Sequence, residues 1–181
     1  AKSLTQLSSL SAPGRTSVLS IDIDGRISSV PVQSAHHEVF QGRKVLFAIS
    51  KDNDPAWIVD WIDFHVRAHG VDAVLIYDNG STGYDAADLL ARVRLVPGLA
   101  AGVIVRWPYR FGCNGPRFNG TYCQYTAIET ARRRFLNDAA GMVQIDVDEL
   151  IVPERGTSLF DELERSSRGA LLFGGTWIEN I

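Results

Sequence analysis

The arrangement of apolar and polar residues changes near residue 44 of this 181-residue chain. Residues 18–32 alternate apolar with polar residues around Asp24-Gly25, which predicts a surface β-hairpin because Asp-Gly suits a tight two-residue turn. After residue 44, continuous apolar runs are separated by segments in which apolar residues recur every three or four positions. Continuous runs are typical of strands buried on both faces, and the recurring pattern is typical of helices.

These runs predict the order of the elements. Strands are expected at residues 45–49, 73–77, 101–107, 142–145 and 170–173, and helices at residues 56–69, 84–94, 121–137 and 158–166. Strands that alternate with helices predict an α/β fold with a mostly parallel sheet flanked by helices. We expect two parts: residues 1–43, a loose lead-in with the hairpin and a connector, and residues 44–181, the α/β domain. A long loop is expected at residues 108–120.

Composition restricts the classes of function. Apolar residues make up 45% of the chain and charged residues 22%, as in a globular protein with a real core. The net charge of −3 offers no basic surface for nucleic acid. No apolar run reaches the roughly 18 residues needed to span a bilayer. The two cysteines, Cys113 and Cys123, leave the redox compartment open: a disulfide that closes the intervening loop and two free thiols are both compatible. We favour a cytoplasmic, bacterial setting, and the lumen of the secretory pathway stays open.

Acidic residues follow three of the predicted strands, at residues 52–54, at Asp78 and at residues 146–149. Because ligands of open α/β sheets bind at the carboxyl ends of the strands, we expect these groups at one edge. If Asp146-Val147-Asp148 is extended, the carboxylates of Asp146 and Asp148 point to the same side, where their hard oxygens suit Mg²⁺ or Mn²⁺. The alternative is an ordinary solvated strand end.

Five short motifs in order carry a family resemblance. They are Asn53-Asp54, Trp61-Ile62-Asp63-Phe64-His65, Gly70-Val71, residues 76–82 and residues 145–150, with Pro153 close behind the last. This series resembles glycosyltransferases of the family 2-like and family 92-like groups, over roughly residues 44–181. The resemblance implies a GT-A fold of Rossmann-like type and transfer of a sugar, with inversion, from a nucleotide-diphosphate donor to a hydroxyl of a glycan or another acceptor.

The resemblance also implies site residues. The nucleotide sugar would be bound by Asn53, Asp54, Asp78, Asn79, Asp146 and Gln124, and a Mn²⁺ or Mg²⁺ ion by Asp146 and Asp148. For Gln124 a packing role is favoured over a sugar contact. The chain departs from the family pattern in three respects. Asp54 is shorter than the usual Glu, Gly83 replaces a common acid although Asp85 lies nearby, and the part after Glu149 is short for an acceptor half. No general base is assigned. We therefore expect a fragment of a longer protein, and a non-catalytic nucleotide-sugar-binding domain is an alternative function.

Two further signals have alternative interpretations. Asp22 and Asp24 in Ile21-Asp22-Ile23-Asp24-Gly25 resemble the Asp-x-Asp of haloacid-dehalogenase-like phosphatases, but Arg26 replaces the expected Thr and the flanking alternation favours a hairpin. His65 and His69 share a helix face and could bind a metal together. Helix packing for His65 and a solvated position for His69 are favoured. Trp107, Tyr109 and Tyr122 could line a sugar site or serve as core and loop anchors.

Overall fold

The computed structural model describes residues 17–115, 118–120, 122–152 and 156–178. The chain forms two units, residues 1–35 and residues 36–181, which are described separately. In the first unit, β1 (Val18–Ile23) pairs with antiparallel β2 (Arg26–Pro31). Asp24 and Gly25 join them with φ angles of 52° and 79°. Two successive positive φ angles match the twist of a hairpin, so the predicted turn is confirmed.

The second unit contains a four-stranded parallel sheet in the order β5-β4-β3-β8. Its strands are β3 (Lys44–Ser50), β4 (Ala73–Asp78), β5 (Ala101–Arg106) and β8 (Gly141–Gln144). The helices are α1 (Pro55–His69), α2 (Ala86–Val93), α3 (Tyr122–Arg134) and α4 (Leu159–Arg165), and a 3-10 turn, η1 (His37–Val39), precedes β3. The predicted α/β class with a parallel, Rossmann-like sheet is thus confirmed, as are these four strands and four helices.

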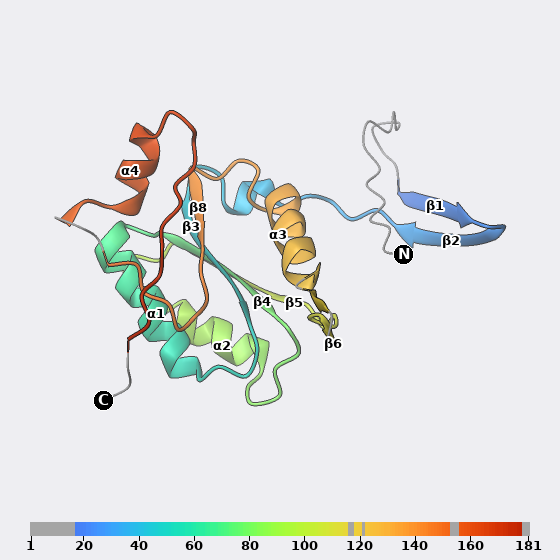
Figure 1. The fold of residues 1–181 in the computed structure, drawn as a ribbon, viewed down its shortest axis with the longest axis horizontal. Coiled ribbons are helices and arrows are strands. Elements are labelled where there is room, and N and C mark those ends of the chain that lie inside the picture. Colours follow the sequence, from blue (N-terminus) through green and yellow to red (C-terminus); the bar gives the residue numbers. More distant parts are fainter. Residues whose placement is uncertain (1–16, 116–117, 121, 153–155, 179–181) are drawn as a thin grey trace. The chain divides into compact units, whose positions relative to one another are not determined.

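Two hydrophobic layers enclose the sheet. Side chains of β3 and β4 that point to one face, such as Leu46 and Ile76, pack with Trp61 of α1 and Leu89 of α2. Those that point to the other face pack with the small buried residues of α3. Figure 1 shows α1 and α2 on one side of the sheet and α3 on the other. Every residue of β4 is buried, and complete burial of each large apolar side chain contributes about 1.5–3 kcal/mol.

Two elements differ from the prediction. The expected loop at residues 108–120 contains a short antiparallel pair, β6 (Cys113–Gly115) with β7 (Phe118–Gly120). The expected strand at residues 170–173 is wrong, because residues 170–178 have no regular secondary structure. Leu172 is fully exposed and no described strand pairs with this segment. An apolar run becomes a strand only where a neighbour accepts and donates its backbone hydrogen bonds. Within the described residues, no helix is both long enough and apolar enough to cross a membrane.

The end of α1 gives a test of this local structure. Gly70 follows the helix in the left-handed region, with φ 65° and ψ 30°, and a Cβ at this position would meet no atom within 4 Å. Gly70→Ala should therefore lower the free energy of unfolding through backbone strain alone, by about 1–2 kcal/mol. Urea denaturation measures the change. Gly174→Ala is the matched control, since it also enters open space but without a positive φ. Equal stability of the two variants would contradict this account of the helix end.

Candidate functional site

The carboxyl ends of the four strands meet at one edge because all the pairings are parallel. The chain passes from β3 to β4 to β5 in one direction, whereas β8 lies on the opposite side of β3. The strand order therefore reverses between β3 and β8. Ligands of open α/β sheets bind outside the carboxyl ends of the strands at such a reversal, which is called the switch point. The loops that follow β3 and β8 carry two of the three predicted acidic segments.

The loop after β3 holds Asn53 and Asp54. The amide of Asn53 donates to the hydroxyl of Ser50 over 3.0 Å, and Asp54 Oδ1 accepts from the Ala56 N–H over 2.8 Å. Asp54 therefore caps α1. Oδ1 of Asp54 is engaged in this cap, whereas Oδ2 has no described hydrogen bond.

Asp52 joins the loop after β3 to the loop after β4. Its Oδ1 accepts from the N–H groups of Thr82 at 2.6 Å and Gly83 at 3.1 Å, and its own N–H donates to Ser81 Oγ at 2.9 Å. The hydrogen bonds from the Thr82 and Gly83 amides hold the pKa of Asp52 below its usual range. Asp52 belongs to the acidic segment at residues 52–54 that was expected at this edge, but its role as a link between two loops was not predicted. Its positive φ of 51° is a conformation that Asp and Asn tolerate better than most residues.

Asp78 and Asn79 lie at the end of β4. Asp78 is only 7% exposed, and its Oδ1 accepts from the Ser81 N–H at 3.2 Å. The side-chain amide of Asn79 donates to the carbonyls of Trp107 and Tyr109, both at 2.7 Å. Both residues therefore shape the loops at this edge. Asp85 lies further along, where it caps α2 through a 2.7 Å bond from the Ala87 N–H.

The acidic turn, residues Asp146–Glu149, follows β8. The extended conformation that was one possibility for Asp146-Val147-Asp148 is not observed, because the Glu149 N–H donates to the Asp146 carbonyl at 3.0 Å and closes a turn. The Glu149 carboxylate in return accepts from the Asp146 N–H at 3.0 Å. Val147 is buried in the core, and Asp146 and Asp148 on either side of it are exposed. Both carboxylates thus face solvent even though the segment is a turn.

The acidic turn concentrates negative charge. Partial burial raises the pKa of Asp146, and the neighbouring carboxylates of Glu149 and then Asp148 raise it further. Because the pKa of Asp146 is raised in the folded chain, the stability that its protonated form contributes is lost as pH rises through this raised pKa. A cation bound near Asp146 would offset this repulsion at neutral pH.

The side chains of the acidic turn fit a divalent cation in part. Neither Asp146 nor Asp148 uses its carboxylate in a hydrogen bond or ion pair with the described part of the chain, so both are available as hard oxygen ligands. No group of three His, Cys, Asp or Glu side chains among the described residues is arranged to hold a metal. Among the described residues, Asp146 and Asp148 are thus two candidate ligands of such a cation.

The remaining predicted residues lie elsewhere. Gln124 is half-buried on α3, which covers the face of the sheet opposite to α1, and no described hydrogen bond joins it to the acidic turn. Trp107 is buried between Tyr77 and Tyr109, with ring centroids 4.9 and 4.6 Å away, as expected of a core anchor. Cys123 is a buried free thiol whose sulfur accepts from the Trp107 indole at 3.2 Å. The side chains of Cys113 and Tyr122 lie outside the described residues.

Sequence reasoning missed the residues that hold the acidic turn. The indole N–H of Trp61 donates to the Glu149 carbonyl at 3.0 Å. His65 and His69, one and two turns further along α1, bond to the backbone of Ile151 at 3.4 and 2.7 Å. Packing of His65 is confirmed, whereas the solvated position expected for His69 is wrong, since this ring is buried. The four-residue spacing along an apolar stripe was the available signal.

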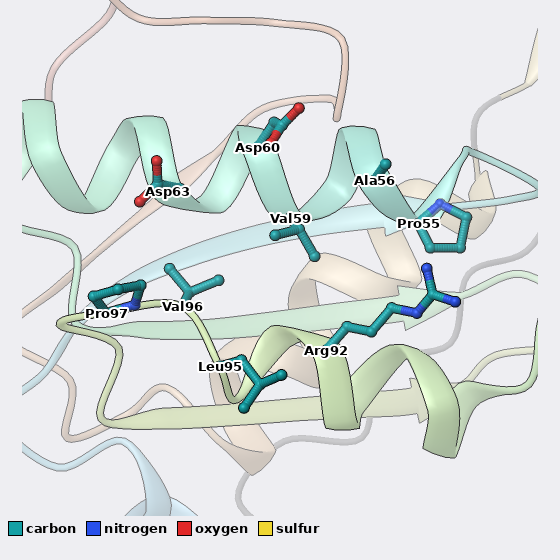
Figure 2. Close-up of a pocket in the computed structure, with 9 residues that line it drawn as sticks. All are labelled: Pro55, Ala56, Val59, Asp60, Asp63, Arg92, Leu95, Val96 and Pro97. Atoms are coloured by element: carbon teal, nitrogen blue, oxygen red, sulfur yellow. The ribbon is translucent and has the colours of Figure 1, made fainter.

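Asp22 and Asp24 belong to the hairpin, where Asp22 Oδ1 accepts from the Gly25 N–H at 2.9 Å. This hairpin does not supply the buried parallel strand that the phosphatase hypothesis needs. A groove of about 390 Å³ lies between α1 and the region around Leu95, and Figure 2 shows Val59 and Arg92 among the side chains that line it. None of the predicted site residues lines this groove.

Comparisons with protein-family models and with curated protein sequences found no match to this chain.

The link made by Asp52 predicts a pH effect. Because the folded pKa of Asp52 is lowered, its contribution to stability is present above the ordinary value of 3.8 and is lost as pH falls below it. Asp52→Asn keeps the tolerated left-handed backbone but removes the charge. The variant should be less stable than wild type at neutral pH, and this difference should shrink below pH 3.8. Urea denaturation across the pH range measures it. Asp88→Asn, at an exposed position in the first turn of α2, is the control. An unchanged difference at all pH values would refute the proposed link.

Proposed function

We propose that residues 44–181 bind a nucleotide-diphosphate sugar as a GT-A domain and take part in transfer of the sugar to an acceptor hydroxyl, with a divalent metal ion. The observation that carries this proposal is the position of the acidic turn. It lies after β8, at the reversal of strand order where open α/β sheets bind ligands. The order of the sequence motifs supports the same proposal independently.

The proposal assigns a role to each segment at the sheet edge. Asp146 and Asp148 would hold Mn²⁺ or Mg²⁺, which, when bound, supplies a Lewis acid for the departing diphosphate. Asp54 uses one carboxylate oxygen in the helix cap, and Asp78 uses one in the turn that follows β4. The other oxygen of each could accept a hydrogen bond from an N–H or O–H group of the nucleoside. The Asn79 amide nitrogen already donates to two carbonyls, so Asn79 would contribute to binding mainly by fixing the loop.

Chemistry at the acceptor needs a general base that removes the hydroxyl proton. None of the described residues is assigned this role. A non-catalytic nucleotide-sugar-binding domain is therefore the second candidate function. It shares the donor site with the first and predicts binding without sugar transfer or donor hydrolysis.

The experiment that tests the donor site is calorimetric titration with UDP and with GDP, each with and without Mn²⁺. We expect binding that depends on the metal, because the acidic turn repels a diphosphate unless a cation lies between them. Asp148→Asn should weaken it at least about tenfold, since loss of groups around a metal commonly costs ten- to a hundredfold. Asp88→Asn, on α2, is the matched control and should bind like wild type.

Binding of neither nucleotide in the presence of Mn²⁺ would refute the donor-site assignment. Equal affinity of Asp148→Asn and wild type would refute the role of the acidic turn. Asp22→Asn distinguishes the phosphatase hypothesis from the proposed function, because this variant should abolish a phosphatase activity and leave nucleotide binding intact. Binding without transfer or hydrolysis of UDP-sugars would favour the non-catalytic domain.

A further inference from the structure

Three buried side chains on α1 form a stripe that we call the latch: Trp61, His65 and His69. They are spaced four residues apart, so they lie above one another on one helix face. Their rings are in contact, with centroids 5.6 Å apart for Trp61–His65 and 5.8 Å for His65–His69. Each nitrogen of these three rings bonds to a backbone group. One of these groups, the Trp61 carbonyl, lies on α1 itself, and the others lie at least 82 positions away in the sequence.

The hydrogen bonds of the latch fix the proton on each imidazole. Nδ1 of His65 lies 2.7 Å from the Trp61 carbonyl and must donate, which leaves Nε2 to accept from the Ile151 N–H at 3.4 Å. In His69 the roles are exchanged. Nδ1 accepts from the Leu159 N–H at 3.1 Å, and Nε2 donates to the Ile151 carbonyl at 2.7 Å.

Both rings must therefore be neutral. A protonated imidazole has no acceptor nitrogen. A second proton on His65 would therefore place an N–H opposite the Ile151 N–H, and a second proton on His69 would place one opposite the Leu159 N–H. The stacked arrangement of the two rings, with 28° between their planes, also disfavours charge on both. Burial lowers the pKa of His65, and charge on His69 lowers it further, against the opposing effect of the bond to the Trp61 carbonyl.

No described carboxylate forms an ion pair with either ring. On α1, Asp63 is paired with Arg67 at 2.7 Å. In the acidic turn, the Glu149 carboxylate bonds to the Asp146 N–H. On α4, Glu162 is paired with Arg165 at 3.3 Å. The remaining acids on these elements, listed by position, are Asp60, Asp146, Asp148, Asp161 and Glu164, and none has a described bond to an imidazole. A proton on the latch would thus gain no salt bridge to compensate for the lost acceptor.

The latch bonds to the last residue of the acidic turn and to a residue that follows the turn in the sequence. Trp61 fixes the carbonyl of Glu149, the last residue of the turn, and the two histidines fix both backbone groups of Ile151. His69 also connects to the start of α4, where its carbonyl accepts from Ser158 Oγ at 2.8 Å. The last described hydrogen bond from this segment to the sheet runs from the Ile145 N–H to the Phe47 carbonyl at 3.3 Å. Between residues 146 and 152, the described hydrogen bonds are made within the acidic turn or to α1.

We propose that Trp61, His65 and His69 are positioning residues, which hold the acidic turn in its binding arrangement only while both imidazoles are neutral. The inference rests on the proposed function for what the turn binds. The latch contribution to stability is present above pH 6.5, the ordinary value for His, and is lost as pH falls toward the lowered pKa of His65. The affinity for metal and nucleotide should decrease over the same pH range.

The test has two readouts on the full chain. The first is hydrogen exchange of the Ile151 and Leu159 amides by NMR, expressed as protection factors between pH 7.5 and 5. The second is the affinity for UDP with Mn²⁺ over the same range. We expect protection of both amides to fall with acidification, and the dissociation constant to rise by up to about tenfold per pH unit once a histidine titrates.

Variants separate the latch from other titrating groups. Gln cannot be protonated; His65→Gln retains an acceptor for the Ile151 N–H, and His69→Gln retains a donor for the Ile151 carbonyl. The double variant should lose the pH dependence of amide protection above pH 5, and with it the part of the pH dependence of UDP–Mn²⁺ affinity that the latch causes. The double variant His36→Gln/His37→Gln, which changes the other two histidines of the chain, is the control and should keep it.

The outcomes are distinguishable. Constant protection of Ile151 and Leu159 from pH 7.5 to 5 in the wild type would overturn the latch, even if the Gln variants do not fold. Falling protection with unchanged UDP–Mn²⁺ affinity would overturn the positioning role. Falling protection in a protein that binds no nucleotide at pH 7.5 would support the latch and overturn the proposed function.

Discussion

The pairing of β3 with β4 between two helical layers is the constraint on which the rest of this structure depends. Both strands are apolar on both faces, so polar side chains can occur only where the strands end. The parallel direction then gathers those ends at one edge. Addition of β8 on the far side of β3 places the acidic turn next to the loop that begins α1. The edge is polar because the core excludes polar groups from every other part of these strands.

Local patterns predicted most of the second unit because its strands and helices obey them separately. Continuous apolar runs predicted β3 and β4, and the recurrence of apolar residues every three or four positions predicted α1. The predictions that were wrong depended on contacts with residues far away in the sequence. Residues 170–173 have a strand composition but no partner strand. His69 was expected to be solvated because its partners, the backbone groups of Ile151 and Leu159 and the hydroxyl of Ser158, are 82 to 90 positions away in the sequence.

The candidate site shows the same division. The sequence pattern identified the acids after β3, β4 and β8, and the structure separates them by the use of their side chains. Asp52, Asp54 and Asp85 accept hydrogen bonds from backbone amides and order loops or helix ends. Asp146 and Asp148 have carboxylates without such partners in the described chain. Residue identity alone could not make this distinction, because Asp is equally suited to capping and to metal binding.

The hydrogen bonds of Asp52 have a consequence for any ligand at this edge of the sheet. They join the loops after β3 and β4 within the folded chain, with Asp52 held in a left-handed conformation that few residues adopt. Loops that are ordered during folding lose their conformational entropy at that stage. A ligand that contacts them need not supply the free energy to order them again, and more of its contact energy appears as affinity. The ability to bind at this edge would then be determined partly by a side chain that need not touch the ligand.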